Sequence, residues 1–151
     1  MRGRRVRIRL TSSVLGLFLA LIVGSASAEV VVVVSAQNPT ESLTRAQLTD
    51  IYLGRLNRFP SGESVTPIDQ REGATAHRLF YRDYLGQTPA QIKAHWSKLI
   101  FTGRGQPPRS VADDSAMADT VAASPDALGY LDSTYLDSAE VGDRLRVVVI
   151  E

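Results

Sequence analysis

The sequence predicts one α/β domain in which helices cover a sheet, and three observations support this prediction. Residues 30–34 are five consecutive valines, a run typical of a strand that is buried on both faces. Two Thr-x-x-Gln segments, at residues 44–47 and 88–91, match the capping box that opens an α-helix. Segments of strand and helix character then alternate as far as residue 150, as in a sheet covered by helices.

The first half of the domain is expected to contain two further strands and helices in alternation. The helix opened by the first capping box continues to about Tyr52, and Gly54 supplies a left-handed stop. Residues 65–68 predict a short strand, placed at an edge of the sheet because Pro67 has no N–H to donate. A second helix follows, from about residue 75 through Tyr84, and Gly86 closes it. Its buried stripe is expected to be Leu79, Phe80, Tyr84 and Leu85.

The second half of the domain repeats this alternation. The helix opened by the second capping box is expected to reach Phe101, with one apolar face, and the Gly- and Pro-containing residues 102–109 form a loop. A strand is expected at 127–131, where Gly129 permits close approach of backbone or of a ligand. The remaining expected elements are a helix near 114–123, a short helical turn at 133–136 and a last strand at 145–150.

The charge distribution narrows the classes of function. The chain has 151 residues, 17 Lys+Arg, 16 Asp+Glu and no cysteine. Five arginines lie in the first 28 residues, so residues 29–151 carry 12 basic and 16 acidic side chains, a net charge of −4. An acidic domain argues against a nucleic-acid binder, which usually presents a basic face. The lack of cysteine excludes disulfides, thiolate metal sites and cysteine nucleophiles.

Residues 1–28 are predicted to be a secretory signal peptide, and residues 29–151 the domain. An arginine-rich start is followed by an apolar run at 14–23 and by the small-x-small segment Ala26-Ser27-Ala28, the pattern that signal peptidase accepts. The run is short for a membrane-spanning helix, which needs about 20 residues. We therefore expect cleavage near Ala28 and export to a periplasm, with no membrane association afterwards. An uncleaved anchor is the alternative.

The candidate site is the strand-to-helix turn at residues 69–77. Free amides at a helix N-terminus attract an anion, and small side chains let an oxyanion approach them. Arg71 could add a charge-assisted contact. The alternative is that Thr75 only caps the helix and Gly73 only turns the chain. The predicted oxyanion-binding residues are Gln70, Arg71, Gly73, Ala74, Thr75 and Ala76.

The sequence contains no motif that indicates catalysis. The two histidines, His77 and His95, lie on different expected helices without a metal-ligand partner four residues later, and both are interpreted as packing or surface residues. The pair Asp113-Asp114 is interpreted as a helix cap, because adjacent helical residues do not face each other. We therefore expect neither an enzyme, a bound metal nor a cofactor.

Three segments resemble the phosphate-specific periplasmic substrate-binding proteins of ABC transporters, which have the type II periplasmic-binding-protein fold. Residues 43–55 resemble that family's segment ending in Ile-Tyr/Phe-x-Gly-Lys, and Leu128-Gly129-Tyr130 resembles its Ile-Gly-Tyr strand. Residues 96–108, WSKLIFTGRGQPP, are similar to a stretch shared by a branch of short exported proteins that carry the same domain. Together the matching segments cover about residues 42–136.

The resemblance implies one lobe of that fold, with an oxyanion at the turn that reads Arg-x-x-Gly-Ser-Gly-Thr in the family. Aligned on Gly73, this chain has Gln70 at the arginine position and Ala74, Thr75 and Ala76 at the Ser-Gly-Thr positions. A shift of one residue instead places Arg71 on the arginine and Thr75 on the serine.

The expected function is that of an exported solute-binding protein that holds phosphate or a similar small oxyanion. The alternative is an accessory or interaction protein that kept the fold and lost the ligand. The partners implied by the resemblance are an ABC transporter or a second copy of the chain.

Overall fold

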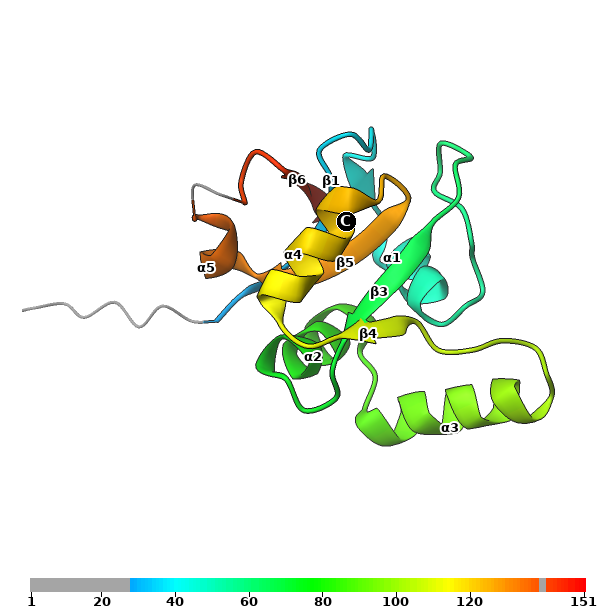
Figure 1. The fold of residues 1–151 in the computed structure, drawn as a ribbon. Helices are drawn as coiled ribbons and strands as arrows, with labels where there is room; N and C mark the ends of the chain where they lie inside the picture. Colours follow the sequence, from blue (N-terminus) through cyan, green and yellow to red (C-terminus); the bar gives the residue numbers. More distant parts are fainter. Residues whose placement is uncertain (1–27, 139–140) are drawn as a thin grey trace, which may run out of the picture.

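A six-stranded mixed sheet organises the domain (Figure 1). The computed structural model describes residues 28–138 and 141–151, so the predicted signal peptide lies outside it except for Ala28. The strands are β1 (Val30–Ser35), β2 (Ser42–Leu43), β3 (Thr66–Gln70), β4 (Arg109–Val111), β5 (Ala127–Asp132) and β6 (Leu145–Ile150). The helices are α1 (Arg45–Tyr52), α2 (Thr75–Phe80), the π-helical η1 (Tyr81–Leu85), α3 (Pro89–Phe101), α4 (Asp114–Ala123) and α5 (Ser133–Leu136).

The strand order is β2-β6-β1-β5-β3-β4. The valine strand β1 lies inside the sheet, antiparallel to both β5 and β6. Strand β3 runs parallel to β5 on one side and to β4 on the other, and β2 runs parallel to β6. The predicted α/β class with a mixed sheet is therefore confirmed.

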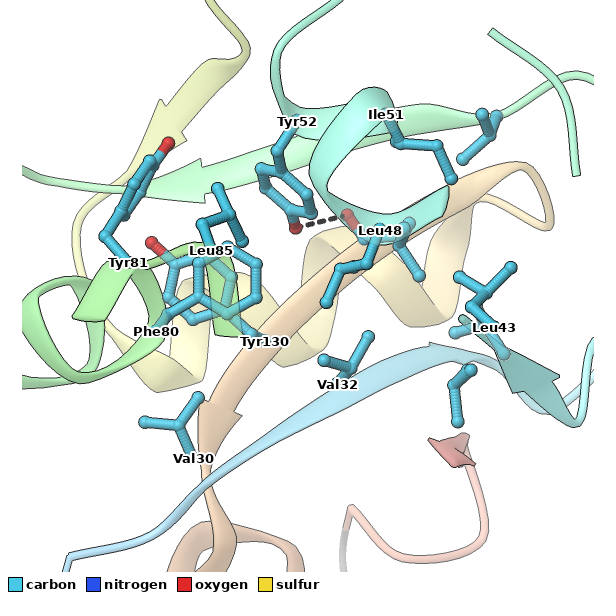
Figure 2. Close-up of a cluster of buried hydrophobic side chains, with 14 of the residues drawn as sticks. Val30, Val32, Leu43, Leu48, Ile51, Tyr52, Phe80, Tyr81, Leu85 and Tyr130 are labelled. Atoms are coloured by element: carbon cyan, nitrogen blue, oxygen red, sulfur yellow. Dashed lines mark hydrogen bonds between the residues drawn. The ribbon is translucent and has the colours of Figure 1, made fainter. Parts of the chain in front are cut away.

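Helices cover both faces of the sheet, as predicted. Val32 and Val34 of β1 point into a cluster with α1, α2 and η1, where the rings of Tyr52, Phe80 and Tyr130 meet (Figure 2). Val33 points the other way, into a second cluster with α4. This division explains the uninterrupted valine run, because each face of β1 packs against its own apolar layer.

The predicted helix caps are present. Thr44 and Thr88 each accept the backbone N–H of the third helical residue, and Gln47 and Gln91 return the bond to the cap. Gly54 and Gly86 have positive φ angles of 70° and 62°, a backbone conformation that glycine adopts without steric cost. The only buried residue of α3 is Trp96, so this helix stands away from the sheet (Figure 1).

Three strand assignments differ from the sequence prediction. Strand β3 is not at an edge, because β4 lies outside it. Pro67 is tolerated because β4 pairs only with Ile68, Asp69 and Gln70, so Pro67 lies outside that ladder. Strand β4 begins at Arg109, where a loop was predicted; three residues are too few to show a period in the sequence. The two-residue strand β2 was also missed.

The close approach predicted at Gly129 occurs, but side chains of α4 make it rather than backbone or a ligand. A Cβ atom at Gly129 would lie 2.5 Å from Met117 Sδ and 2.7 Å from Val121 Cγ2. Glycine therefore lets α4 pack directly on β5. Among the described residues, no helix is long and apolar enough to cross a membrane.

Gly129→Ala is expected to destabilise the domain by about 1–3 kcal/mol, the usual cost of overpacking a well-filled core. The free energy of unfolding in urea, measured by circular dichroism, checks this. The matched control is Gly105→Ala, whose added Cβ would lie no closer than 3.8 Å to Leu99 or Trp96. Equal stability of the two variants would contradict the packing described here.

Candidate functional site

The turn between β3 and α2 leaves backbone donors free. Gly73 has a φ angle of 90°, and the chain enters α2 at Ala74, which has no side-chain cap. Within the described part of the chain, the N–H groups of Thr75, Ala76 and His77 have no hydrogen-bond partner. Such groups at the start of a helix carry a partial positive charge and can hold an anion.

A guanidinium group that the sequence analysis did not single out lies over this turn. Arg78 donates from Nη1 to the Gly73 carbonyl over 2.6 Å and from Nη2 to Thr75 Oγ1 over 3.3 Å. The Thr75 hydroxyl accepts in the second bond, so its own proton remains available. The three-residue spacing of Thr75 and Arg78 on a helix is the signal that could have identified the pair.

Of the six predicted site residues, three are exposed and the other three, Gln70 among them, are half-buried or buried. Arg71, Gly73 and Thr75 are exposed, and Arg71 uses its N–H to bind the Val111 carbonyl while its side chain extends into solvent. Ala74 is half-buried and Ala76 is buried, so they contribute backbone rather than side chain.

Gln70 lies beside the turn but its side chain is directed into the protein. It is 2% exposed. Its Nε2 donates to Asp114 Oδ1 over 2.6 Å and to the Tyr130 carbonyl over 3.1 Å. Both amide hydrogens are therefore used within the protein, so in this arrangement an anion at the turn would receive donors from the backbone, Thr75 and the arginines. The assignment of Gln70 and its neighbours as ligand contacts remains a prediction.

Beneath the turn, the carboxylate of Asp69 is buried in a hydrogen-bond network. The Tyr81 hydroxyl donates to Oδ2 over 2.6 Å, and the Tyr130 hydroxyl donates to Oδ1. The N–H of Gln70 donates to the same Oδ1 over 2.8 Å. His77 Nε2 lies 3.9 Å from Oδ1, and the His77 ring packs on Tyr81 with centroids 4.5 Å apart. The network joins β3, β5 and η1 directly under the candidate site.

Burial and then the charge of Asp69 raise the pKa values of Tyr81 and Tyr130 well above that of an exposed tyrosine. Burial is also the main cause of the raised pKa of Tyr52, whose hydroxyl donates to the Ile68 and Leu128 carbonyls. The three hydroxyls therefore keep their protons at neutral pH and act as donors.

The histidines behave as packing residues, as predicted. His95 Nε2 lies 2.8 Å from the Leu53 carbonyl oxygen, and His77 belongs to the network under the turn. The Asp113 side chain caps α4 through the N–H of Ala116, again as predicted. Within residues 28–138 and 141–151, no group of three or more His, Asp or Glu side chains is arranged to hold a metal ion.

The raised tyrosine pKa values predict loss of stability in alkali. The folded state holds these protons more tightly than the unfolded chain, so the stabilisation is complete below pH about 10 and is lost as the pH rises above it. Each such tyrosine is expected to remove about 1.4 kcal/mol of unfolding free energy per pH unit. Urea unfolding at pH 8, 10 and 11 measures this slope.

Tyr81→Phe should make that alkaline slope shallower, because it removes one of the buried hydroxyls whose pKa is raised. An identical slope in the wild type and in Tyr81→Phe would show that Tyr81 ionises as easily in the folded protein as in the unfolded chain.

Solved structures with a similar fold include proteins named as phosphate-transport or phosphate-binding proteins. An ABC-type phosphate transport receptor from Vibrio cholerae matches with a TM-score of 0.62 and 17% identity over 82% of this chain. PstS from Borrelia burgdorferi matches with a TM-score of 0.62 and 13% identity over 82% of this chain. A candidate phosphate ABC transporter substrate-binding protein with bound phosphate, from Clostridium perfringens, matches with a TM-score of 0.59 and 16% identity over 82% of this chain.

The chain spans about half the length of these structures, since the matches cover 46%, 47% and 45% of them respectively. No protein-family model and no curated protein sequence matches it. At these identities the likeness establishes the fold. The described domain therefore has the fold of a single lobe of the phosphate ABC transporter substrate-binding proteins.

Proposed function

We propose that this domain is an exported solute-binding protein that holds phosphate or a similar small oxyanion at the turn between β3 and α2. The observation that carries the proposal is the set of three free N–H groups at Thr75, Ala76 and His77, with the Arg78 guanidinium fixed beside them. The likeness in fold to phosphate-transport proteins supports the same assignment.

The electrostatics of the turn favour an anion over a cation. Two arginines, Arg71 and Arg78, outnumber the one exposed acid of the turn, Glu72, and the helix start adds a partial positive charge. The nearest buried acid, Asp69, already accepts three hydrogen bonds. Its lone pairs are thus largely satisfied, so it offers little to a cationic ligand.

The proposal also covers where the protein acts and with which partners. Cleavage near Ala28 would release residues 29–151 into a periplasm, where an ABC transporter would receive the ligand. The proteins of similar fold are named as substrate-binding or transport proteins, and we propose a non-enzymatic role here too. A second copy of the chain could supply the other side of the site.

Phosphate is expected to raise the melting temperature in a saturable manner. At 100 times the dissociation constant, a ligand stabilises the folded state by ~2.7 kcal/mol, a shift of roughly 8–15 °C for a domain of this size. Differential scanning fluorimetry with phosphate, sulfate, arsenate and chloride at matched ionic strength measures the shift. Arg71→Ala and Arg78→Ala should each reduce it strongly.

The control variant is Arg146→Ala, which removes an exposed arginine on β6, a strand separated from β3 by β1 and β5. It should bind like the wild type. A shift that chloride reproduces, or that survives in both Arg71→Ala and Arg78→Ala, would sink the site assignment.

An accessory or interaction protein is the second candidate, and one observation favours it. The end of α3 exposes two large apolar side chains, Ile100 at 56% and Phe101 at 92%. Apolar side chains at one exposed helix end are typical of a contact surface. On this alternative the protein self-associates, Phe101→Ser makes it monomeric, and phosphate has no effect on melting. Sedimentation velocity separates the candidates, because a monomer stabilised by phosphate excludes the second.

A further inference from the structure

A pocket of about 590 Å³ opens beside the turn, between the α2–η1 segment and α3. Figure 1 shows α3 standing apart from α2 on this side of the sheet. The volume lies in the range of sites for small organic molecules, about 300–1,000 Å³. Gln70, Glu72, His77 and Arg78 line the pocket and also belong to the turn or follow it directly. The pocket therefore borders the candidate oxyanion site and shares His77 and Arg78 with it.

Most of the wall is apolar. Ile92, Trp96 and Ile100 come from α3, Tyr81 comes from η1, and Pro107 and Pro108 come from the loop before β4. An apolar wall contributes no binding free energy to a bare phosphate ion, because removing an ion from water costs free energy unless polar partners replace the water. An apolar group attached to the anion would gain, since each Å² of apolar surface removed from water contributes to binding.

The charged side chains at the pocket indicate which charge the polar end of a ligand would carry. Arg78 is held at the mouth by the Gly73 carbonyl, and Lys93 lines the pocket from α3. Arg82 also lines it but is paired with Asp83 over 2.5 Å. Arg78 and Lys93 are therefore the basic groups left for a ligand, while Glu72 and the buried Asp69 carry the opposing charge. Arg78, fixed beside the free amides of the turn, is the group placed to bind an anion.

The buried acid at the pocket, Asp69, is already hydrogen-bonded within the protein. Asp69 lies at the pocket with an exposure of 8%, and Tyr81, Tyr130 and the Gln70 N–H satisfy it. These three bonds occupy most of the acceptor sites of the carboxylate without removing its charge. The free donors of the region are those of the turn.

We propose that the ligand is an organic phosphomonoester, whose phosphate binds at the turn and whose flat apolar group fills the pocket against Trp96. This inference rests on the proposed function, because it takes the turn as the place of the oxyanion. The inference extends the proposed function, because it gives the pocket and α3 the role of selecting the ligand.

Isothermal titration calorimetry with three probes tests the inference: inorganic phosphate, 1-naphthyl phosphate and 1-naphthol. We expect 1-naphthyl phosphate to bind at least ten-fold more tightly than inorganic phosphate, and 1-naphthol to bind weakly. Ile92→Ser and Ile100→Ser should each weaken 1-naphthyl phosphate by about three- to ten-fold and leave inorganic phosphate unchanged. Val149→Ser, on the exposed face of β6, is the matched control and should change neither.

Arg78→Ala tests the oxyanion site separately from the apolar pocket, because it should weaken the binding of inorganic phosphate and of 1-naphthyl phosphate alike. Equal affinity for the two anions, or an advantage of the naphthyl ester that survives in Ile92→Ser and Ile100→Ser, would overturn the assignment of the pocket and leave the oxyanion site standing. Absence of binding by either anion would overturn the proposed function and this inference with it. Tight binding of 1-naphthol, equal to that of its phosphate, would overturn the choice of a phosphomonoester.

Discussion

The hydrogen bonds that two buried tyrosines donate to Asp69 join the sheet to the helical segment that follows it. Asp69 lies one residue before the end of β3, Tyr130 comes from β5 and Tyr81 from η1. A buried carboxylate deprived of its donors costs about 1–3 kcal/mol or more, so the network fixes where η1 lies on the sheet. Since α2 continues directly into η1, it also fixes the direction in which the α2 amides point.

Aromatic packing holds the same junction from the apolar side. Phe80 stacks on Tyr130 with ring centroids 3.9 Å apart and planes 3° from parallel. Tyr52 packs on both rings from α1, and its hydroxyl bonds the Leu128 carbonyl (Figure 2). The three rings thus pack their faces in the core, while the hydroxyls of Tyr52 and Tyr130 donate to buried polar groups, the usual behaviour of buried tyrosine. Support for the turn therefore comes from residues distant in sequence.

This dependence on distant residues explains what could and could not be predicted from the sequence. The helices opened by Thr44 and Thr88 were predictable because a capping box is local, as was the valine strand. The buried Tyr81 was missed from the predicted stripe, although it lies four residues before Leu85, a spacing that places both on one helix face. The partners of Asp69 were missed because a hydroxyl 61 residues away leaves no local pattern. The turn itself was located, since Gly73 and the small residues after it are a local signal.

Enclosure is the constraint on any anion site built on this turn. Charged contacts in open water contribute little, typically 0–1 kcal/mol, and the same contacts strengthen as apolar groups replace water around them. Arg78 and the turn lie at the surface, so their contribution to the free energy of anion binding depends on which groups cover them. Helix α3 contributes Ile92 and Trp96 to the pocket that Arg78 also lines, and an apolar group seated there would complete a wall that excludes water. The features that would select an organic phosphate would then also strengthen the binding of its phosphate, so affinity and selectivity at this site have one physical origin.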